Sequence, residues 1–185
     1  MKKRNWINRW NEQGHIDHKF QMYEIILKYL KHPPESLLDI GCGLALESEF
    51  FFTNHKTNLF LLDGDFEPTQ EKLREIKYGS VDSFRFYNTI TDLKNSFDKR
   101  QLSYTFVDAN NIDLPDHLKF DLIYSNQSCG YHYPIETYKE LIQAHSHKDT
   151  TVILDLRKHF KYDNIKIKNI LVDSRKFIKA QIEFL

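Results

Sequence analysis

Two glycines follow a short apolar run early in the chain, and here the residue types and their spacing first suggest chemistry. The run Leu37–Ile40 is typical of a strand that is buried on both faces of a parallel sheet. Gly41 and Gly43 lack side chains, so the backbone can take unusual dihedral angles and a ligand can approach it closely. The segment from residue 44 to about 54 can then begin a helix with free N–H groups. This pattern predicts a nucleotide-type site.

A dinucleotide site is disfavoured at this loop. The dinucleotide pattern needs a third glycine to seat a pyrophosphate on the helix terminus, and Leu46 occupies that position. The stretch Leu38-Asp39-Ile40-Gly41-Cys42-Gly43 instead resembles the first motif of the class I S-adenosylmethionine-dependent methyltransferases. The resemblance implies that the cofactor, S-adenosyl-L-methionine, places its amino-acid end here and leaves as S-adenosyl-L-homocysteine. It assigns Asp39, Gly41, Cys42 and Gly43 to the cofactor site.

The resemblance also gives a role to an acid at the end of the second predicted strand, residues 58–63. Asp63 occupies that end, and in the family such an acid accepts hydrogen bonds from the two ribose hydroxyls. A carboxylate suits a vicinal diol because it only accepts and the diol offers two donors. Asp65 is the alternative ribose ligand, and a solvated acid in the Asp63-Gly64 turn is the interpretation without a ligand.

Asp108 and Ala109 follow the third predicted strand, residues 102–107, where family members recognise adenine. A carboxylate followed by a free N–H would read the adenine amino group and its neighbouring acceptor. An Asp-Asn turn explains the same residues without a ligand. Ser125 ends the fourth predicted strand, residues 120–125, and is also assigned to the cofactor site.

The loop after that strand, residues 126–134, is the richest group of polar and aromatic side chains. Ligands of open α/β sheets bind outside the carboxyl ends of the strands, so we expect the methyl acceptor here. The loop departs from the Asn-Pro-Pro-Tyr pattern of nucleobase and amine N-methyltransferases. His132 is the candidate base, because an unperturbed pKa of about 6.5 leaves it mostly neutral. Tyr131 and Tyr133 would face the sulfonium or orient the acceptor. A surface histidine that only forms hydrogen bonds is an equally weighted interpretation.

Methyl transfer from a sulfonium is an in-line displacement, so it needs orientation but no metal and no protein nucleophile. The chain has nine histidines, but their spacing does not favour a metal site. His145 and His147 cannot share a helix face, and no carboxylate or cysteine completes a set with His15 and His18. Cys129 has no base beside it in the sequence, so it is not expected to act as a nucleophile.

The remaining pattern predicts an α/β fold, a three-layer, doubly wound sheet of seven strands. The resemblance implies the strand order 3-2-1-4-5-7-6, mostly parallel with the last strand antiparallel. Further helices are expected at residues 18–31, 67–77, 89–100 and 135–146, a fifth strand at 150–156, and a closing hairpin at 165–174 and 177–185. Asp17 and Asn88 are the expected N-caps of the first and third of these helices, and His32-Pro33-Pro34 the end of the first.

The 185 residues suit a single domain, 1–185, with a lid and helix at 1–34 and an insertion at 64–88 between the second and third strands. For Trp6, Trp10, His15 and His18, a lid over the cofactor and simple packing on the sheet are weighted evenly. The insertion has no assigned role. Little chain is left for a substrate domain, so loops, and in a homodimer a second subunit, would hold the acceptor.

Charge and cysteine content restrict the partners and the compartment. Lysine plus arginine and aspartate plus glutamate both number 26, so the formal net charge is zero and nucleic acid is disfavoured. No apolar run is long enough for a bilayer span, and no secretory signal is evident. The two cysteines offer no disulfide framework, which favours the cytoplasm.

Three functions are compatible with these features. The leading hypothesis is a methyltransferase that acts on an oxygen or nitrogen of a small molecule. The alternative is a non-catalytic protein that binds S-adenosylmethionine as a partner or regulator, because no acceptor signature is specific. A nucleic-acid methyltransferase is the least favoured, although the segment 158–168 carries a local basic patch.

Overall fold

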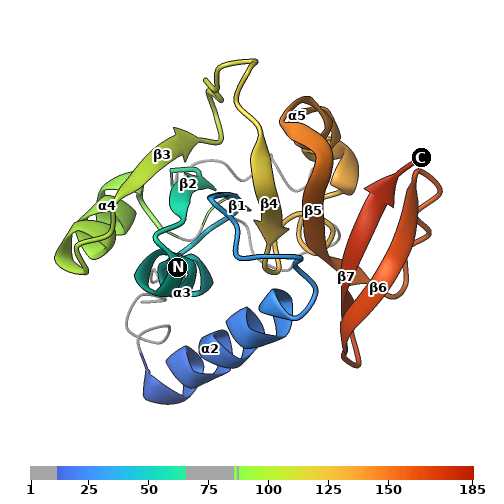
Figure 1. Ribbon diagram of the computed structural model, residues 1–185, viewed down its shortest axis with the longest axis horizontal. Coiled ribbons are helices and arrows are strands. Elements are labelled where there is room, and N and C mark those ends of the chain that lie inside the picture. The colour runs from blue at the N-terminus through green and yellow to red at the C-terminus, as the bar shows by residue number, and fades with distance from the viewer. Residues whose placement is uncertain (1–11, 66–85, 87) are drawn as a thin grey trace, which may run out of the picture.

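The computed structural model describes residues 12–65, 86 and 88–185, and these form a seven-stranded sheet flanked by helices (Figure 1). The strand order is β3-β2-β1-β4-β5-β7-β6, which confirms the predicted fold and order. β7 runs antiparallel to both of its neighbours, β5 and β6, and all other neighbouring strands are parallel. The strands are β1 (Ser36–Ile40), β2 (Asn58–Asp63), β3 (Tyr104–Asp108), β4 (Phe120–Ser125), β5 (Ser146–Arg157), β6 (Ile165–Asp173) and β7 (Phe177–Phe184).

Helices cover both faces of the sheet. They are α2 (Gln13–Leu27), α3 (Leu46–His55), α4 (Ile90–Lys99), the short 3-10 helix η2 (Ile135–Thr137) and α5 (Lys139–Ala144). On one face, Ile26 of α2, Phe51 of α3 and Phe97 of α4 are fully buried in one apolar core. On the other face, Ile135 of η2 and Ile142 of α5 belong to a second core. The central strands are therefore apolar on both sides, as their sequences predicted.

Strand register brings the predicted acids to one edge of the sheet. β1 lies between β2 and β4 and is parallel to both, so its end, where the glycine loop starts, lies beside the ends of its neighbours. Asp63 of β2 lies opposite Asp108 of β3 in the parallel pairing. The carboxyl ends of parallel strands meet at the same edge, so residues that are distant in the sequence share one site.

The first helix differs from the prediction at both ends. It begins at Gln13 with Glu12 at the N-cap position, whereas Asp17 lies inside the helix and accepts a hydrogen bond from Gln13 Nε2 at 2.8 Å. The helix extends toward its start because Ile16 packs against the core formed with α3. It ends at Leu27, before the two prolines, and looser i to i+3 hydrogen bonds follow it.

Other boundaries also differ. Thr89, and not Asn88, caps α4, because its Oγ1 accepts a hydrogen bond from Asp92 N at 3.0 Å. The predicted helix 135–146 is divided into η2 and α5, and β5 starts at Ser146. This earlier start is explained by pairing, since Phe120 N donates to His145 O as β4 begins. Trp6, Trp10, the predicted helix 67–77 and most of the insertion 64–88 lie outside the described residues.

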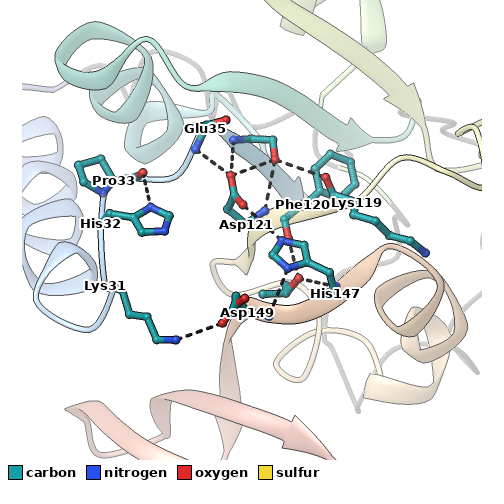
Figure 2. Close-up of polar contacts among 11 residues, drawn as sticks. Lys31, His32, Pro33, Glu35, Lys119, Phe120, Asp121, His147 and Asp149 are labelled. Atoms are coloured by element: carbon teal, nitrogen blue, oxygen red, sulfur yellow. Dashed lines mark hydrogen bonds and ion pairs between the residues drawn. The ribbon is translucent and has the colours of Figure 1, made fainter.

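Asp121 fixes the start of β1 at the opposite edge of the sheet (Figure 2). Its Oδ2 accepts hydrogen bonds from Glu35 N at 2.8 Å and Ser36 N at 3.0 Å. Its Oδ1 lies 3.3 Å from His147 Nε2, at the start of β5. One carboxylate of β4 thus contacts the first residues of β1 and β5. Among the described helices, none is long and apolar enough to cross a membrane.

We expect Asp121→Ala to destabilise the fold by about 1–3 kcal/mol, because two backbone N–H groups lose their acceptor. Urea unfolding measures the change. Asp149→Ala is the matched control, since among the described residues the side chain of Asp149 makes only a surface ion pair with Lys31, and its backbone N–H donates to His147 Nδ1 in either case. Equal unfolding midpoints for the two variants would contradict the role given to Asp121.

Candidate functional site

The loop after β1 folds as its glycines predicted. Gly41 and Gly43 have φ angles of +71° and +50°, in the left-handed region that favours glycine. The N–H groups of Gly41 and Cys42 both donate to Leu62 O, at 2.8 and 3.0 Å. A Cβ on Gly41 would lie 2.2 Å from Ser128 Oγ, so no other residue fits without moving the loop after β4.

Asp63 ties this loop to the end of β2. Its Oδ2 accepts a hydrogen bond from Gly43 N and its Oδ1 one from Gly64 N, both at 2.8 Å. The side chain is largely buried but still lines the cavity described below. Arg100, which follows α4, donates to Leu44 O and so holds the other end of the loop. The loop is therefore anchored at both ends.

Asp39 lies under the loop as a buried carboxyl group. Ser48 Oγ of α3 donates to its Oδ2 at 2.6 Å. Burial raises the pKa of Asp39 to about 7, although the hydrogen bond from Ser48 acts in the opposite direction. A carboxyl group with this pKa is poised between its two protonation states at neutral pH.

A cavity of about 450 Å³ opens above these residues, at the carboxyl ends of the central strands. Of the predicted site residues, seven line it: Asp39, Gly41, Cys42, Gly43, Asp63, His132 and Tyr133. The others, Asp108, Ala109, Ser125 and Tyr131, are not part of the lining that the described residues form. His15 and His18 line it from α2. The structure thus brings the glycine loop and part of the loop after β4 to one shared space.

The predicted adenine residues form a turn at the edge of this space. Asp108 Oδ1 accepts a hydrogen bond from Asn110 N at 2.8 Å, and Ala109 N donates to Asp63 O at 2.9 Å. The backbone N–H of Ala109 is thus engaged by the protein. Phe86 is buried against Gly64 and lines the cavity. Adenine recognition by Asp108 stays a prediction.

Ser125 connects the two loops. Its side chain is fully buried, and its Oγ donates to Ile40 O and accepts from Cys129 N, both at 2.8 Å. Through these bonds it fastens the loop after β4 to the end of β1. Cys42 and Cys129 are buried free thiols, and burial raises the pKa of both. Neither is therefore an activated nucleophile.

The loop after β4 is tightly wound. Ser128 O accepts hydrogen bonds from the backbone N–H groups of Tyr131, His132 and Tyr133, at 3.2, 2.8 and 3.0 Å. The ring of Tyr131 packs edge-on against that of His132, with centroids 4.9 Å apart, and the guanidinium of Arg157 lies 4.8 Å from the Tyr131 ring. Tyr131 therefore packs against His132 without lining the cavity, whereas His132 and Tyr133 line it.

Sequence reasoning missed a chain of buried charged groups beneath the cavity. Lys19 Nζ of α2 pairs with Glu47 Oε1 of α3 at 2.7 Å, and Tyr124 OH donates to the same oxygen at 3.1 Å. Lys179 Nζ of β7 donates to Tyr124 OH at 3.3 Å and pairs with Asp155 of β5 at 2.8 Å. These groups connect the first helix, the helix of the glycine loop and the last strands.

The pKa shifts of the buried acids follow from these pairings. Burial alone would raise the pKa of Glu47, but Lys19, together with Lys179 and a backbone hydrogen bond, holds that pKa below its usual value. Burial raises the pKa of Asp155, and Lys179 opposes the shift. The one feature of the sequence that could have indicated these buried charges is Asp155 within the apolar run of β5, because a charged residue in a buried strand needs a partner. Within the described ranges, no group of three or more metal-ligating side chains occurs.

No protein-family model and no curated protein matches this sequence. Solved structures match its fold. The plantazolicin methyltransferase BpumL, in complex with a monoazolic desmethylPZN analog and SAH, matches with a TM-score of 0.57 and 17% identity, over 84% of this chain and 53% of that one. This chain therefore spans about half the length of that enzyme.

Two archaeal structures are matched over most of their length. A methyltransferase from Pyrococcus furiosus gives a TM-score of 0.56 at 17% identity, over 90% of this chain and 82% of that one. A protein from Pyrococcus horikoshii OT3 gives 0.62 at 12% identity, over 95% and 93%. The chain therefore has the seven-stranded fold of the class I methyltransferases.

The buried carboxyl of Asp39 leads to a pH prediction. Its pKa rises from 3.8 to about 7 in the folded state, so the folded protein binds this proton more tightly than the unfolded chain. This contribution to stability is complete below about pH 4 and is lost as the pH rises to about 7. Asp39→Asn removes the titration. Urea unfolding should show the stability of the variant, relative to the wild type, increasing across this range, and parallel pH profiles would contradict the assignment.

Proposed function

We propose that this protein is an S-adenosylmethionine-dependent methyltransferase that transfers a methyl group to an oxygen or nitrogen of a small-molecule acceptor. The observation that carries the proposal is the shared cavity, which the glycine loop and Asp63 line on one side and His132 and Tyr133 on the other. A methyl donor and its acceptor need such a common space. The BpumL structure, which holds SAH and a desmethylPZN analog on the same fold, supports the proposal.

The cofactor fits the chemistry of the glycine-loop side. Three carboxyl groups line the cavity there, those of Asp39, Glu47 and Asp63. Carboxyl groups at this place suit the ammonium and sulfonium groups of the cofactor. The position of Asp63 at the end of β2 supports its assignment to the ribose hydroxyls, and the lack of a side chain at Gly41 lets Ser128 of the loop after β4 pack against the glycine loop.

The residues of the loop after β4 would handle the acceptor. When bound, the cofactor supplies an electrophilic methyl group and leaves as a neutral thioether. His132 would take the proton that the acceptor oxygen or nitrogen loses, since it lines the cavity and the ring of Tyr131 packs against it. Tyr133 would orient the acceptor. The buried free thiols of Cys42 and Cys129 suit the cytoplasm, which we propose as the location.

Cofactor binding is the first test. We expect S-adenosylhomocysteine to raise the melting temperature, because a ligand that binds only the folded state adds about 2.7 kcal/mol of stability at a hundred times its Kd. Asp63→Asn should weaken binding by about tenfold or more in calorimetric titration, since it removes a charged acceptor. Asp65→Asn is the matched control. An unchanged melting temperature at saturating ligand would contradict the proposal, and a larger effect at Asp65 would move the ribose site.

Methyl transfer is the second test. Protein incubated with methyl-labelled cofactor and a metabolite extract should give a labelled small molecule. His132→Gln should slow that transfer by about 10²–10⁴-fold and leave the affinity for S-adenosylhomocysteine unchanged. His117→Gln, in an exposed loop, is the control. Binding without any labelled product would favour the non-catalytic alternative.

A further inference from the structure

Lys19 is a buried cation on the wall of the cavity. Only 9% of the residue is exposed, and its Nζ donates to Glu47 Oε1 at 2.7 Å. A lysine ammonium has three N–H donors, and among the described residues Glu47 is its one hydrogen-bond partner. Two donors are therefore left for something in the cavity. A buried ammonium that is only partly satisfied favours an anionic group beside it.

Lys179 provides an internal comparison, because it lines the same cavity and is satisfied by the protein. Its Nζ pairs with Asp155 Oδ1 at 2.8 Å, donates to Tyr124 OH at 3.3 Å and donates to Asn126 Oδ1 at 3.4 Å. Three groups of the fold thus surround its ammonium, one carboxylate and two hydrogen-bond acceptors, whereas Glu47 is the one such group recorded for Lys19 among the described residues. Lys179 is therefore structural, whereas Lys19 has capacity for a ligand.

The position of Lys19 restricts the ligand to one part of the cavity. It lies on α2, which packs directly on α3 and crosses the end of the sheet where β4 points (Figure 1). The cavity wall next to it contains the glycine loop and Leu46, the first residue of α3. The first-turn N–H groups of a helix lack intrahelical partners and favour negative charge. The ammonium and the start of α3 thus face the same space.

We propose that Lys19 is the carboxylate-binding residue of this cavity. The carboxylate has two potential sources, the amino-acid end of the cofactor at the glycine loop or an acidic acceptor above it. The first source rests on the proposed function, and the second does not. In both, the carboxylate accepts charge-assisted hydrogen bonds from the two donors of Lys19 that Glu47 leaves open. Glu47 is the positioning residue that holds the ammonium toward the cavity.

The first experiment compares two ligands that differ only in the carboxylate: S-adenosylhomocysteine and S-adenosyl-3-thiopropylamine, its decarboxylated form. Calorimetric titration gives both affinities for the wild type and for Lys19→Met. If the cofactor is the source, the variant binds S-adenosylhomocysteine about tenfold or more weakly and the decarboxylated ligand equally well. Lys19→Arg keeps the charge and should restore most of the affinity. Lys28→Met, at the exposed end of the same helix, should bind both ligands as the wild type does.

A second variant separates ligand binding from folding. Lys19→Met alone leaves the Glu47 carboxylate buried without its cation, which can destabilise the protein. Lys19→Met combined with Glu47→Gln removes both charges, so the fold no longer contains an unpaired ion. The double variant should recover the unfolding midpoint of the wild type and still discriminate poorly between the two ligands. Recovery of both stability and discrimination would show that the ion pair is only structural and would overturn the proposal.

The second experiment tests the acceptor as the source. Benzoate and benzyl alcohol, which share a ring and differ in charge, are titrated into protein with and without saturating S-adenosylhomocysteine. If the acceptor supplies the carboxylate, the wild type binds benzoate more tightly than the alcohol, and Lys19→Met loses that preference. If the wild type does not bind S-adenosylhomocysteine at all, the proposed function fails, and the benzoate titration on the free protein still decides the role of Lys19. No carboxylate-dependent effect of Lys19→Met in either experiment would overturn the proposal.

Discussion

The site depends on the attachment of the glycine loop to the end of β2. The carboxylate of Asp63 accepts the N–H groups of Gly43 and Gly64, while Gly41 N donates to Leu62 O. These bonds join the first two strands at the point where a ligand would enter. They need backbone without side chains, because a Cβ on Gly41 would collide with Ser128. The carboxylate that the resemblance assigns to a ribose thus also shapes the loop.

A chain of buried charges connects this loop with the loop after β4. Glu47, on the helix that follows the loop, is joined through Tyr124 to Lys179 of β7. Lys179 pairs with Asp155, whose other oxygen accepts Gln127 N of the loop after β4 at 3.0 Å. Buried ions are stable only when they are paired and hydrogen-bonded, so these groups have to keep one arrangement. The helix α2 joins the same chain through Lys19 and closes one side of the cavity.

The fold was predictable because its signals are local and periodic, as in the apolar run Leu37–Ile40 before two glycines. Seven of the predicted site residues line one cavity because they stand at strand ends, which the topology gathers. Tertiary contacts were not predictable: Asp17 looked like a cap, yet packing on α3 extends the helix past it. The partners of Lys19 and Lys179 lie on other elements, so no local pattern marks them. Asp108 is the last residue of β3 but is not part of the cavity lining that the described residues form, and its role in adenine recognition stays a prediction.

A crystal structure of the protein with S-adenosylhomocysteine tests the central claim most directly. We expect the amino-acid end to lie over Gly41 and Gly43, the ribose hydroxyls to donate to Asp63, and the sulfur to face the space in front of His132. Density for the ligand elsewhere on the protein, or a ribose held by Asp65 with the cavity above the glycines empty, would contradict that claim.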